Sequence, residues 1–282
     1  MDISLAEEQA FSFIPKFTPE VAQDRIEQKK IALVAGTVAS LLSRPKPADI
    51  QCVSVENRLQ PFWLVKISAY TRFDRNNTYT VVTSGPEVRA VTFLGQEVTP
   101  VPSAKGAPTF SLNSVEHCID EHHVAHTYDG LSGTMVDMSK YLGFPKSEIP
   151  DIDHFMVGGT LVIPPQVRAS VVVRQVMTEM IKPVQSAAAI HEERVDVEAI
   201  ELNFRPIYAL EYEWAAKSKR IVIEFDGLTG DITDNGKKLG NLVKGMVTRD
   251  LLFDVTADAL GIIVPGGSIA VKLVKAVVNR NK

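Results

Sequence analysis

The chain has 282 residues, of which 45% are hydrophobic and 23% are charged, and its net charge is −4. These values are ordinary for a globular protein with a core of its own, and the slight acidity gives no global electrostatic case for a nucleic-acid partner. Two cysteines, Cys52 and Cys118, are too few for a disulfide framework, and the acidic N-terminus lacks the basic and apolar regions of a signal peptide. The sequence therefore predicts a protein of the reducing cytoplasm.

The first predicted element is a helix from Thr18 to about Leu42. Thr18-Pro19-Glu20 is a helix-start signal, with a capping hydroxyl, a proline at the first helical position and an acid in the first turn. Apolar residues then recur near the helical period. The run Arg44-Pro45-Lys46-Pro47 ends the helix, because a residue before proline avoids the helical region.

Antiparallel strands are predicted next, because the chain becomes rich in aromatic and β-branched residues. A polar run at residues 72–77 predicts a hairpin loop between two of them. The predicted strands are residues 50–58, 62–70, 78–83, 88–94 and 97–101.

The second half of the chain repeats this order. A helix is predicted from about Gln166 until Pro183 kinks or ends it, because proline removes an intrahelical hydrogen bond. Strands are then predicted at 197–203, 206–214 and 219–225. A repeated order of elements indicates one structural unit used twice.

The repeat makes specific predictions about two prolines and two turns. Pro61 and Pro206 should occupy equivalent places at strand starts, where a missing N–H is tolerated. The segments Asp129–Gly133 and Asp226–Gly230 both begin Asp-Gly-Leu and end in Gly, so we expect the same sort of hairpin turn in both.

The second copy resembles the PepSY type of domain from about Gln166 to Asp231. The matching residues are Tyr-Ala-Leu-Glu-Tyr-Glu-Trp at 208–214 and Ile-Val-Ile-Glu-Phe-Asp-Gly-Leu-Thr-Gly-Asp at 221–231. The first copy is similar in order but has Thr83-Ser84-Gly85-Pro86 at the turn. The resemblance implies a helix packed on an antiparallel sheet and a non-catalytic binding or inhibitory module, and it transfers no catalytic residue.

Metal-capable side chains concentrate in residues 116–126, which hold four of the six histidines and one of the two cysteines. If this segment is a helix, Cys118, His122 and His126 lie four apart along one stripe. If it is a strand, His122 and His126 share a face that Cys118 joins. Such a set can supply three zinc ligands, with water or a distant side chain as the fourth. Candidates for the fourth ligand are Asp129, Asp151, Asp153 and His154.

This cluster supports one enzymatic reading, a metal-dependent hydrolase in which Cys118, His122 and His126 hold zinc and Glu121 acts as the general base. The order of residues is not the His-Glu-x-x-His of a metalloprotease. The alternative is a solvated polar segment whose histidines are hydrogen-bonded. Nucleophilic catalysis finds no support, because the chain has no Gly-x-Ser-x-Gly.

Aromatic residues on the predicted strands, with basic residues nearby, could stack on the bases of a single-stranded nucleic acid, which is therefore one candidate partner. The favoured alternative is that most of the rings bury against the helices. The aromatic residues are Phe62, Trp63, Tyr70, Tyr79, Tyr208, Tyr212 and Trp214.

Two helices are predicted in the C-terminal tail, at about 240–261 and from Ser268 to Asn279. The last helix has an apolar side and a basic side, so it can dock on protein or on an anionic membrane surface. Docking on protein is favoured, because each buried leucine or valine would contribute roughly 1.5–3 kcal/mol.

The sequence as a whole predicts an α+β fold of two related helix-plus-antiparallel-sheet units, an irregular insert and a C-terminal helical tail. The predicted function is a non-enzymatic interaction or assembly subunit of a larger complex or homo-oligomer, with the metal-dependent hydrolase as the alternative. The predicted divisions are residues 1–102 for the first unit, 103–163 for the insert, 164–239 for the second unit and 240–282 for the tail.

Overall fold

The computed structural model describes residues 1–36, 45–103, 106–236, 248–255 and 273–275. The helices and strands in chain order are β1 (Asp2–Leu5), β2 (Glu8–Phe13), α1 (Pro19–Ala35), β3 (Ile50–Val82), β4 (Val91–Phe93), β5 (Gln96–Val98), β6 (Thr109–Asp129), β7 (Lys146–Glu148), β8 (Thr160–Val162), α3 (Ala169–Met180), β9 (Ala189–Trp214), β10 (Lys219–Asp226), β11 (Ile232–Gly236), α4 (Arg249–Leu252) and β12 (Leu273–Lys275).

One ten-stranded mixed sheet organises the chain, and β9 is its spine. β9 runs antiparallel to β3 from the pair Ile50–Trp214 to the pair Asp74–Ala189. On its other edge β9 carries β1 and β2, which are parallel to it, and then β10, which is antiparallel. β6 pairs along the outer edge of β3 from Phe62 to Val82.

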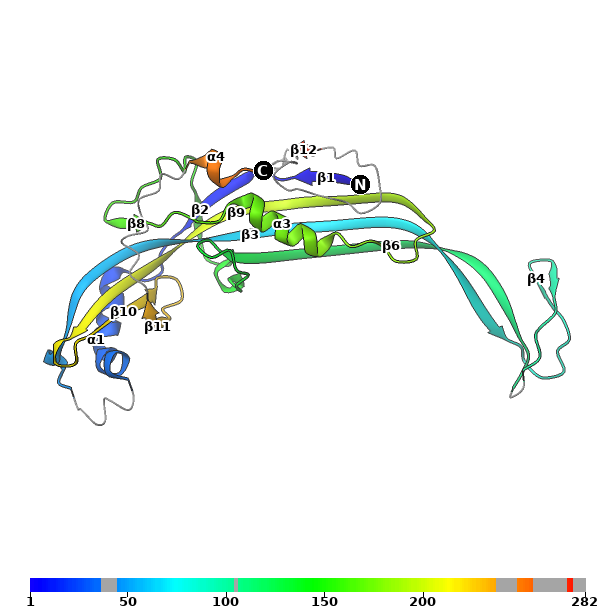
Figure 1. Ribbon diagram of the computed structural model, residues 1–282, viewed down its shortest axis with the longest axis horizontal. Helices are drawn as coiled ribbons and strands as arrows, with labels where there is room; N and C mark the ends of the chain where they lie inside the picture. Colours follow the sequence, from blue (N-terminus) through cyan, green and yellow to red (C-terminus); the bar gives the residue numbers. More distant parts are fainter. Residues whose placement is uncertain (37–44, 104–105, 237–247, 256–272, 276–282) are drawn as a thin grey trace.

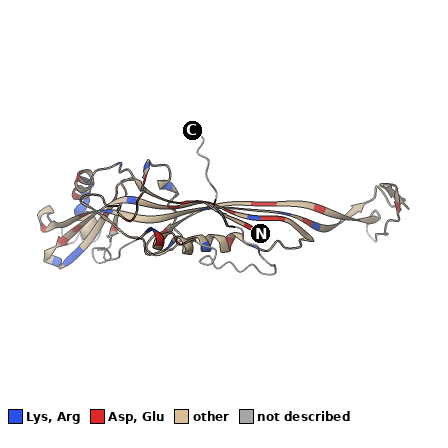
Figure 2. Cartoon of the chain, turned by 90° about the horizontal axis from the view of Figure 1, so that it is seen from above, with Lys and Arg blue, Asp and Glu red and all other residues tan. Residues whose placement is uncertain are grey.

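Three strands are much longer than the five or six residues that are typical of globular proteins. β3 has 33 residues, β9 has 26 and β6 has 21. They give the molecule the shape of an arch, in which one end carries α1 and β10 and the other end carries β4 (Figure 1). From above, the sheet is a long narrow band with α3 along one side (Figure 2).

α1 begins where the sequence predicts. The Thr18 hydroxyl accepts a hydrogen bond from the Val21 N–H at 3.4 Å, and Pro19 holds the first helical position. Gly36, with φ of 77°, caps the helix through its N–H to the Ala32 carbonyl. The predicted continuation to Leu42 lies outside the described residues. The buried side of α1, including Ile26, packs on residues of β9 and β10 that include Tyr208, Tyr212, Trp214 and Phe225.

α3 covers the middle of the sheet. Its buried side chains Val172, Val173, Val176 and Met177 pack on residues of β3 and β9 that include Trp63, Val65, Val197 and Ile200. Val171 lies on the opposite side of the helix and is exposed.

Pro61 and Pro206 are equivalent in the structure, as the repeat predicts. The Gly130 N–H donates to the Pro61 carbonyl at 3.1 Å, and the Gly227 N–H donates to the Pro206 carbonyl at 2.9 Å. Neither proline starts a strand, so that part of the prediction is wrong. The N–H and C=O of a strand residue point to the same side of the strand. Each proline carbonyl points just past the end of the neighbouring strand, and the position of the missing N–H does so too. No backbone hydrogen bond of the sheet is therefore lost at either proline.

The two Asp-Gly turns match in detail. The Asp129 carboxylate accepts from the N–H groups of residues 131 and 132, and Asp226 accepts from those of residues 228 and 229. Gly133 and Gly230, which close the turns, have φ of 71° and 78°. The prediction of one turn type in both places is confirmed.

The correspondence extends to the chain that precedes each helix. The Trp63 indole N–H donates to the Val167 carbonyl at 2.9 Å, and the Tyr208 hydroxyl donates to the Phe17 carbonyl at 2.7 Å. Each of these carbonyls lies just before its helix, so each large ring on the sheet fixes the start of a helix. The two halves therefore share local contacts as well as the order of their elements.

The predicted α+β fold class is nevertheless wrong, because the described chain is mostly sheet. The two halves share one sheet, because β3 of the first pairs with β9 of the second over nearly the whole length of β9. The predicted hairpin loop at residues 72–77 is also wrong, because β3 runs through it from Ile50 to Val82 without a turn.

The tail is described in two short pieces. α4 falls within the helix predicted at about 240–261, whereas residues 273–275, predicted to be helical, form strand β12 parallel to β1. α4 ends at Leu252 and residues 253–255 are not helical, so the prediction of a helix there is wrong. Residues 240–247, 256–261 and the remainder of the last predicted helix lie outside the described residues, and so does most of the basic side assigned to a membrane surface. None of the helices within the described ranges has the length and apolarity needed to cross a membrane.

Candidate functional site

The histidine and cysteine segment is part of strand β6, so the strand alternative of the prediction is the one observed. Alternation along the strand puts Cys118, His122 and His126 on one face. Successive members are four residues apart, which in a strand is about 13 Å. Zinc ligands lie about 2.0–2.3 Å from the ion, so the three side chains do not meet around one metal. Among the described residues, no group of three or more such side chains is close enough to hold one.

Cys118 Sγ lies 3.7 Å from the Glu116 carbonyl oxygen, and each histidine of the set lies beside a carboxylate. His122 Nε2 lies 2.9 Å from an Asp120 carboxylate oxygen, and His126 Nε2 lies 3.3 Å from one of Glu179 on α3. Glu121, the predicted general base, points to the opposite face of the strand and contacts His123.

The candidate fourth ligands also serve local structure. Asp129 closes its turn, Asp151 lies 2.9 Å from His154, and Asp153 accepts from the backbone N–H of Arg249. The structure does not bring them to the β6 histidines as a set, so the geometry offers no support for the zinc hydrolase.

The aromatic residues on the strands are largely buried. Phe62, Trp63, Tyr208, Tyr212 and Trp214 belong to the core, as the alternative to nucleic-acid stacking expects. Tyr70 and Tyr79 keep part of their surface exposed.

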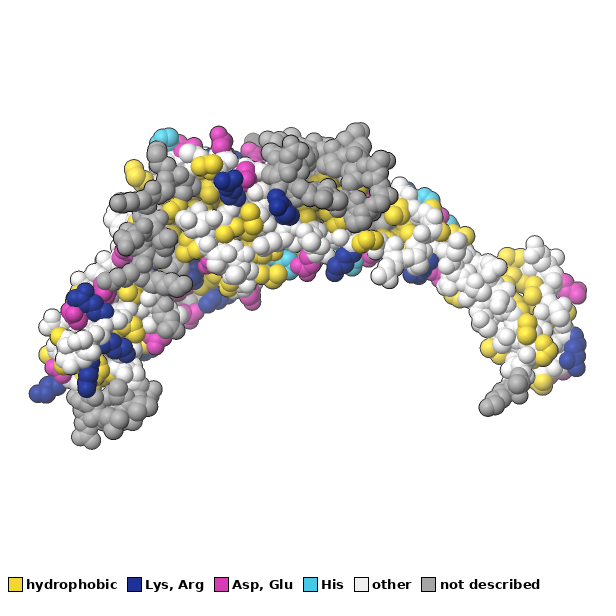
Figure 3. Space-filling view, viewed as in Figure 1, with side chains coloured by type: hydrophobic (Ala, Val, Ile, Leu, Met, Phe, Trp, Pro, Cys, Tyr) yellow, Lys and Arg dark blue, Asp and Glu magenta, His cyan; other side chains and the backbone are white. Residues whose placement is uncertain are grey.

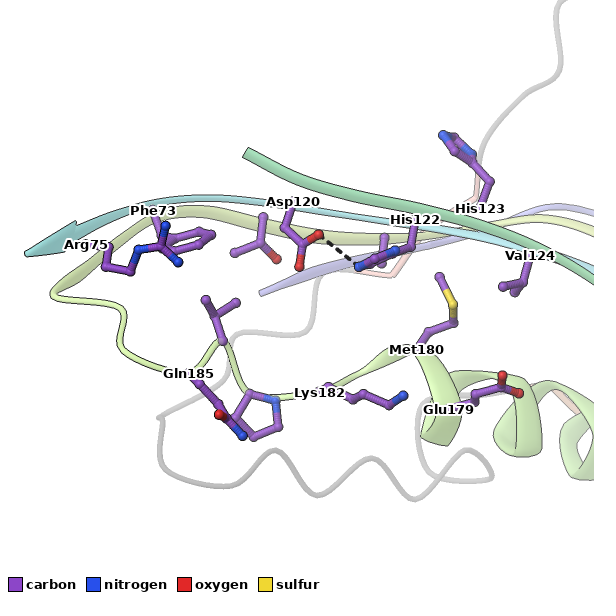
Figure 4. Close-up of a pocket in the computed structure, with 14 residues that line it drawn as sticks. Phe73, Arg75, Asp120, His122, His123, Val124, Glu179, Met180, Lys182 and Gln185 are labelled. Atoms are coloured by element: carbon purple, nitrogen blue, oxygen red, sulfur yellow. Dashed lines mark ion pairs between the residues drawn. The ribbon is translucent and has the colours of Figure 1, made fainter. Parts of the chain in front are cut away.

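A groove of about 500 Å³ lies between the sheet and the segment that leads from α3 to β9 (Figure 4). We call residues 181–185 the strap. Apolar side chains of the sheet, α3 and the strap line much of the groove, while Arg75, Asp120, His122, Glu179 and Lys182 add charge. The apolar lining consists of Ala69, Phe73, Val124, Met180, Pro183 and Val184.

Two polar clusters mark the place where β9 begins, at Ala189, which we call the shoulder. Asp74 on β3 contacts His117 of β6 at 2.7 Å and His191 of β9 at 2.8 Å, so one carboxylate joins three strands. Hydrogen bonds from His117 and His191 lower the pKa of Asp74. Beside it, Glu116 accepts from Tyr79, Asn77 and Arg75.

The hydrogen bonds from Tyr79, Asn77 and Arg75 lower the pKa of the Glu116 carboxyl to about 2. A carboxyl whose pKa is lower in the folded state stabilises that state above its ordinary pKa of about 4.3, and the contribution is lost as the pH falls toward 2. We expect protection factors for hydrogen exchange in residues 75–82 to fall between pH 4.5 and 2.5. Glu116→Gln should be less protected at pH 4.5 and lose little more on acidification. Equal pH dependence in the two proteins would contradict this assignment.

Beyond the shoulder, β3 and β6 continue as a two-stranded ribbon that ends in the hairpin β4–β5. We define residues 75–116 as the arm. Its two long strands, β3 and β6, pair with each other as far as Val82 and Thr109. Among the described residues, the arm has two further pairings, which are the Val101–Thr109 bridge and the β4–β5 hairpin. Apolar side chains are exposed along it, and Figure 3 shows several of them gathered toward its end. They include Tyr79, Val82, Phe93, Leu94, Val101 and Val115.

Sequence reasoning missed the shoulder, the groove and the arm. The signal was present in residues 72–80, where charged and polar residues sit among β-branched and aromatic ones. A ribbon that is solvated on both faces has that composition, and it is easily mistaken for a loop.

Comparison with known proteins finds no matching family model, no matching curated protein and no matching solved structure. What the chain does must therefore be inferred from its own geometry.

Proposed function

We propose that this chain is a non-enzymatic assembly subunit, which joins a larger complex or a homo-oligomer through its arm. The observation that carries the proposal is the arm itself, a ribbon of two strands that leaves the sheet at Asp74 and ends in an exposed hairpin. The cytoplasm, expected from the sequence, remains the predicted setting.

An arm of this kind is poorly suited to stand alone. An isolated two-stranded hairpin is marginally stable in water, and strands with open edges are templates for pairing with another chain. The arm also exposes apolar side chains on a projecting element, where they do not cover a core. A partner that covers the ribbon would bury these side chains and satisfy its edges.

Removing the arm should abolish assembly without unfolding the rest of the protein. Thr78 and Asn113 lie directly opposite each other, so residues 79–112 can be replaced by an Asn-Gly turn that closes the same hairpin. The buried core lies outside the deleted segment except for Phe110. We expect the unfolding free energy per chain to change by less than about 1 kcal/mol, while the mass of the native assembly falls to that of the monomer.

The masses are to be compared by light scattering of the purified proteins and by size-exclusion of native extracts. Thr80→Asn, an exposed polar change on the same ribbon, is the matched control and should assemble as the original chain does. If the complete chain is monomeric in both preparations, the proposed function is wrong.

A further inference from the structure

Leu94 occupies the most demanding position on the arm. It forms the turn between β4 and β5 together with Gly95, with φ of 50° and 78° at the two residues. Positive φ at both central residues favours Asn-Gly, and a bulky residue there is strained. Leu94 is also 90% exposed, the highest value among the large hydrophobic residues described as exposed.

A leucine at this place is explained neither by the turn nor by the core. Asparagine would suit the backbone better, and it would suit water better as well. Phe93 beside it is also exposed, so the tip of the arm presents two neighbouring apolar side chains. An aromatic or aliphatic side chain that enters a pocket can anchor a binding interface.

The groove described above offers six apolar side chains, together with charged ones, in the same chain. The tip cannot reach its own groove by following the ribbon, because the ladder from Phe73 to Val82 holds the two about 30 Å apart along the strand. A second copy carries the same groove without this constraint.

We propose that Phe93 and Leu94 at the tip of one copy insert into the groove of a second copy, between Phe73 and Val184. Glu97, which lies across the hairpin from Thr92, would then meet Lys182 on the strap. Within the described ranges, neither Glu97 nor Lys182 belongs to an ion pair. This contact deepens the proposed function and rests on it.

A membrane is the less suitable occupant for the tip. Stable attachment to a bilayer needs more than one weak signal. The tip offers two apolar side chains, and the surrounding sequence at residues 86–98 carries Glu87 and Glu97 against one cation, Arg89. An anionic surface repels those carboxylates, whereas Lys182 attracts one of them.

Insertion of a tip into a groove is a heterologous contact, so a pair of copies joined in this way still has one free tip and one free groove. Such contacts build open chains unless the rotation closes a ring. We therefore expect the mean mass in sedimentation equilibrium to rise steadily between about 1 and 100 µM.

The sharpest test is Leu94→Asn, because two measurements should move in different directions. Relief of the strained backbone should leave the thermal midpoint of the monomer unchanged or raise it, while self-association weakens at least about tenfold. Met156→Asn, the same kind of change at a large hydrophobic residue that is 87% exposed and lies outside the arm and the groove, is the matched control and should associate as the original chain does.

Charge reversal tests the partner and the pairing. Glu97→Lys and Lys182→Glu should each weaken association, and the chain that carries both changes should recover it, because tip and groove again have opposite charge.

Association that survives Leu94→Asn but is lost with the arm would overturn this contact and leave the proposed function intact. A complete chain that stays monomeric at 100 µM, or a tip that sediments with anionic vesicles instead, would also overturn it.

Discussion

Replacing Trp63 with alanine should lower the free energy of unfolding by about 3–5 kcal/mol. The Trp63 side chain is fully buried between β3 and α3, and it stacks edge-on against Phe253 with ring centroids 5.5 Å apart. Its indole N–H holds the Val167 carbonyl just before α3 begins. Alanine would leave a cavity, remove this hydrogen bond and free the start of the helix.

Urea unfolding followed by circular dichroism measures the effect, and Trp63→Phe separates its two sources. Phenylalanine keeps a buried ring but loses the N–H and three ring atoms, so its cost should lie between that of Tyr208→Phe, about 1 kcal/mol, and that of Trp63→Ala. Tyr208→Phe is the matched control, because Tyr208 makes the equivalent hydrogen bond before α1. A loss below about 1 kcal/mol for Trp63→Ala would mean that α3 does not depend on this anchor.

The local signals in the sequence predicted local structure well. Thr18 and Pro19 begin α1, and the two Asp-Gly turns share their hydrogen bonds, because a cap or a turn is decided by a few adjacent residues. The equivalence of Pro61 and Pro206 was also accessible, since similar runs of apolar and aromatic residues follow both prolines in the sequence.

What the sequence did not predict depends on pairing between distant segments. Residues 72–77 look like a loop, yet they continue β3 because β6 and, as far as Asp74, β9 supply backbone partners. The order of helix and strands is the same in a unit with its own sheet and in a half that contributes to a shared sheet, so this order alone does not distinguish the two folds. The difference lies in whether β3 and β9 pair with each other, and no short pattern encodes that pairing.

The candidate site shows the same limit. Cys118, His122 and His126 suggested one metal, and a helix would have brought them to successive turns. In the strand they lie far apart, and the strongly linked polar groups are Asp74 and Glu116 with partners from neighbouring strands. Chemistry inferred from spacing is therefore conditional on the element that carries the residues.

The second large effect is expected at Asp226, where Asp226→Ala should lower the free energy of unfolding by about 3–5 kcal/mol. The Asp226 carboxylate is buried and accepts from Arg205 at 3.0 Å and from the Tyr141 hydroxyl. Burial raises the pKa of Tyr141, so this hydroxyl stays protonated as a donor. Alanine would leave Arg205 largely buried without its counter-charge, which costs more than the lost hydrogen bonds alone.

The repeated turn supplies the control for this prediction. Asp129 closes the equivalent turn with the same backbone hydrogen bonds, yet none of the ion pairs found among the described residues includes it, so Asp129→Ala should cost only about 1–2 kcal/mol. In urea unfolding, the difference between the free-energy losses of the two alanine variants measures the contribution of the buried charge pair. Asp226→Asn keeps an oxygen for the turn, so its loss of unfolding free energy should lie between those of the two alanine variants. Equal losses at Asp129 and Asp226 would show that the turn, rather than the buried charge pair, is what Asp226 stabilises. A larger loss at Asp226 would mean that its contacts with Arg205 and Tyr141 hold residues 139–141 against the centre of the sheet. Because these residues belong to the insert between the two halves of the repeat, the same contacts would also hold the insert in place.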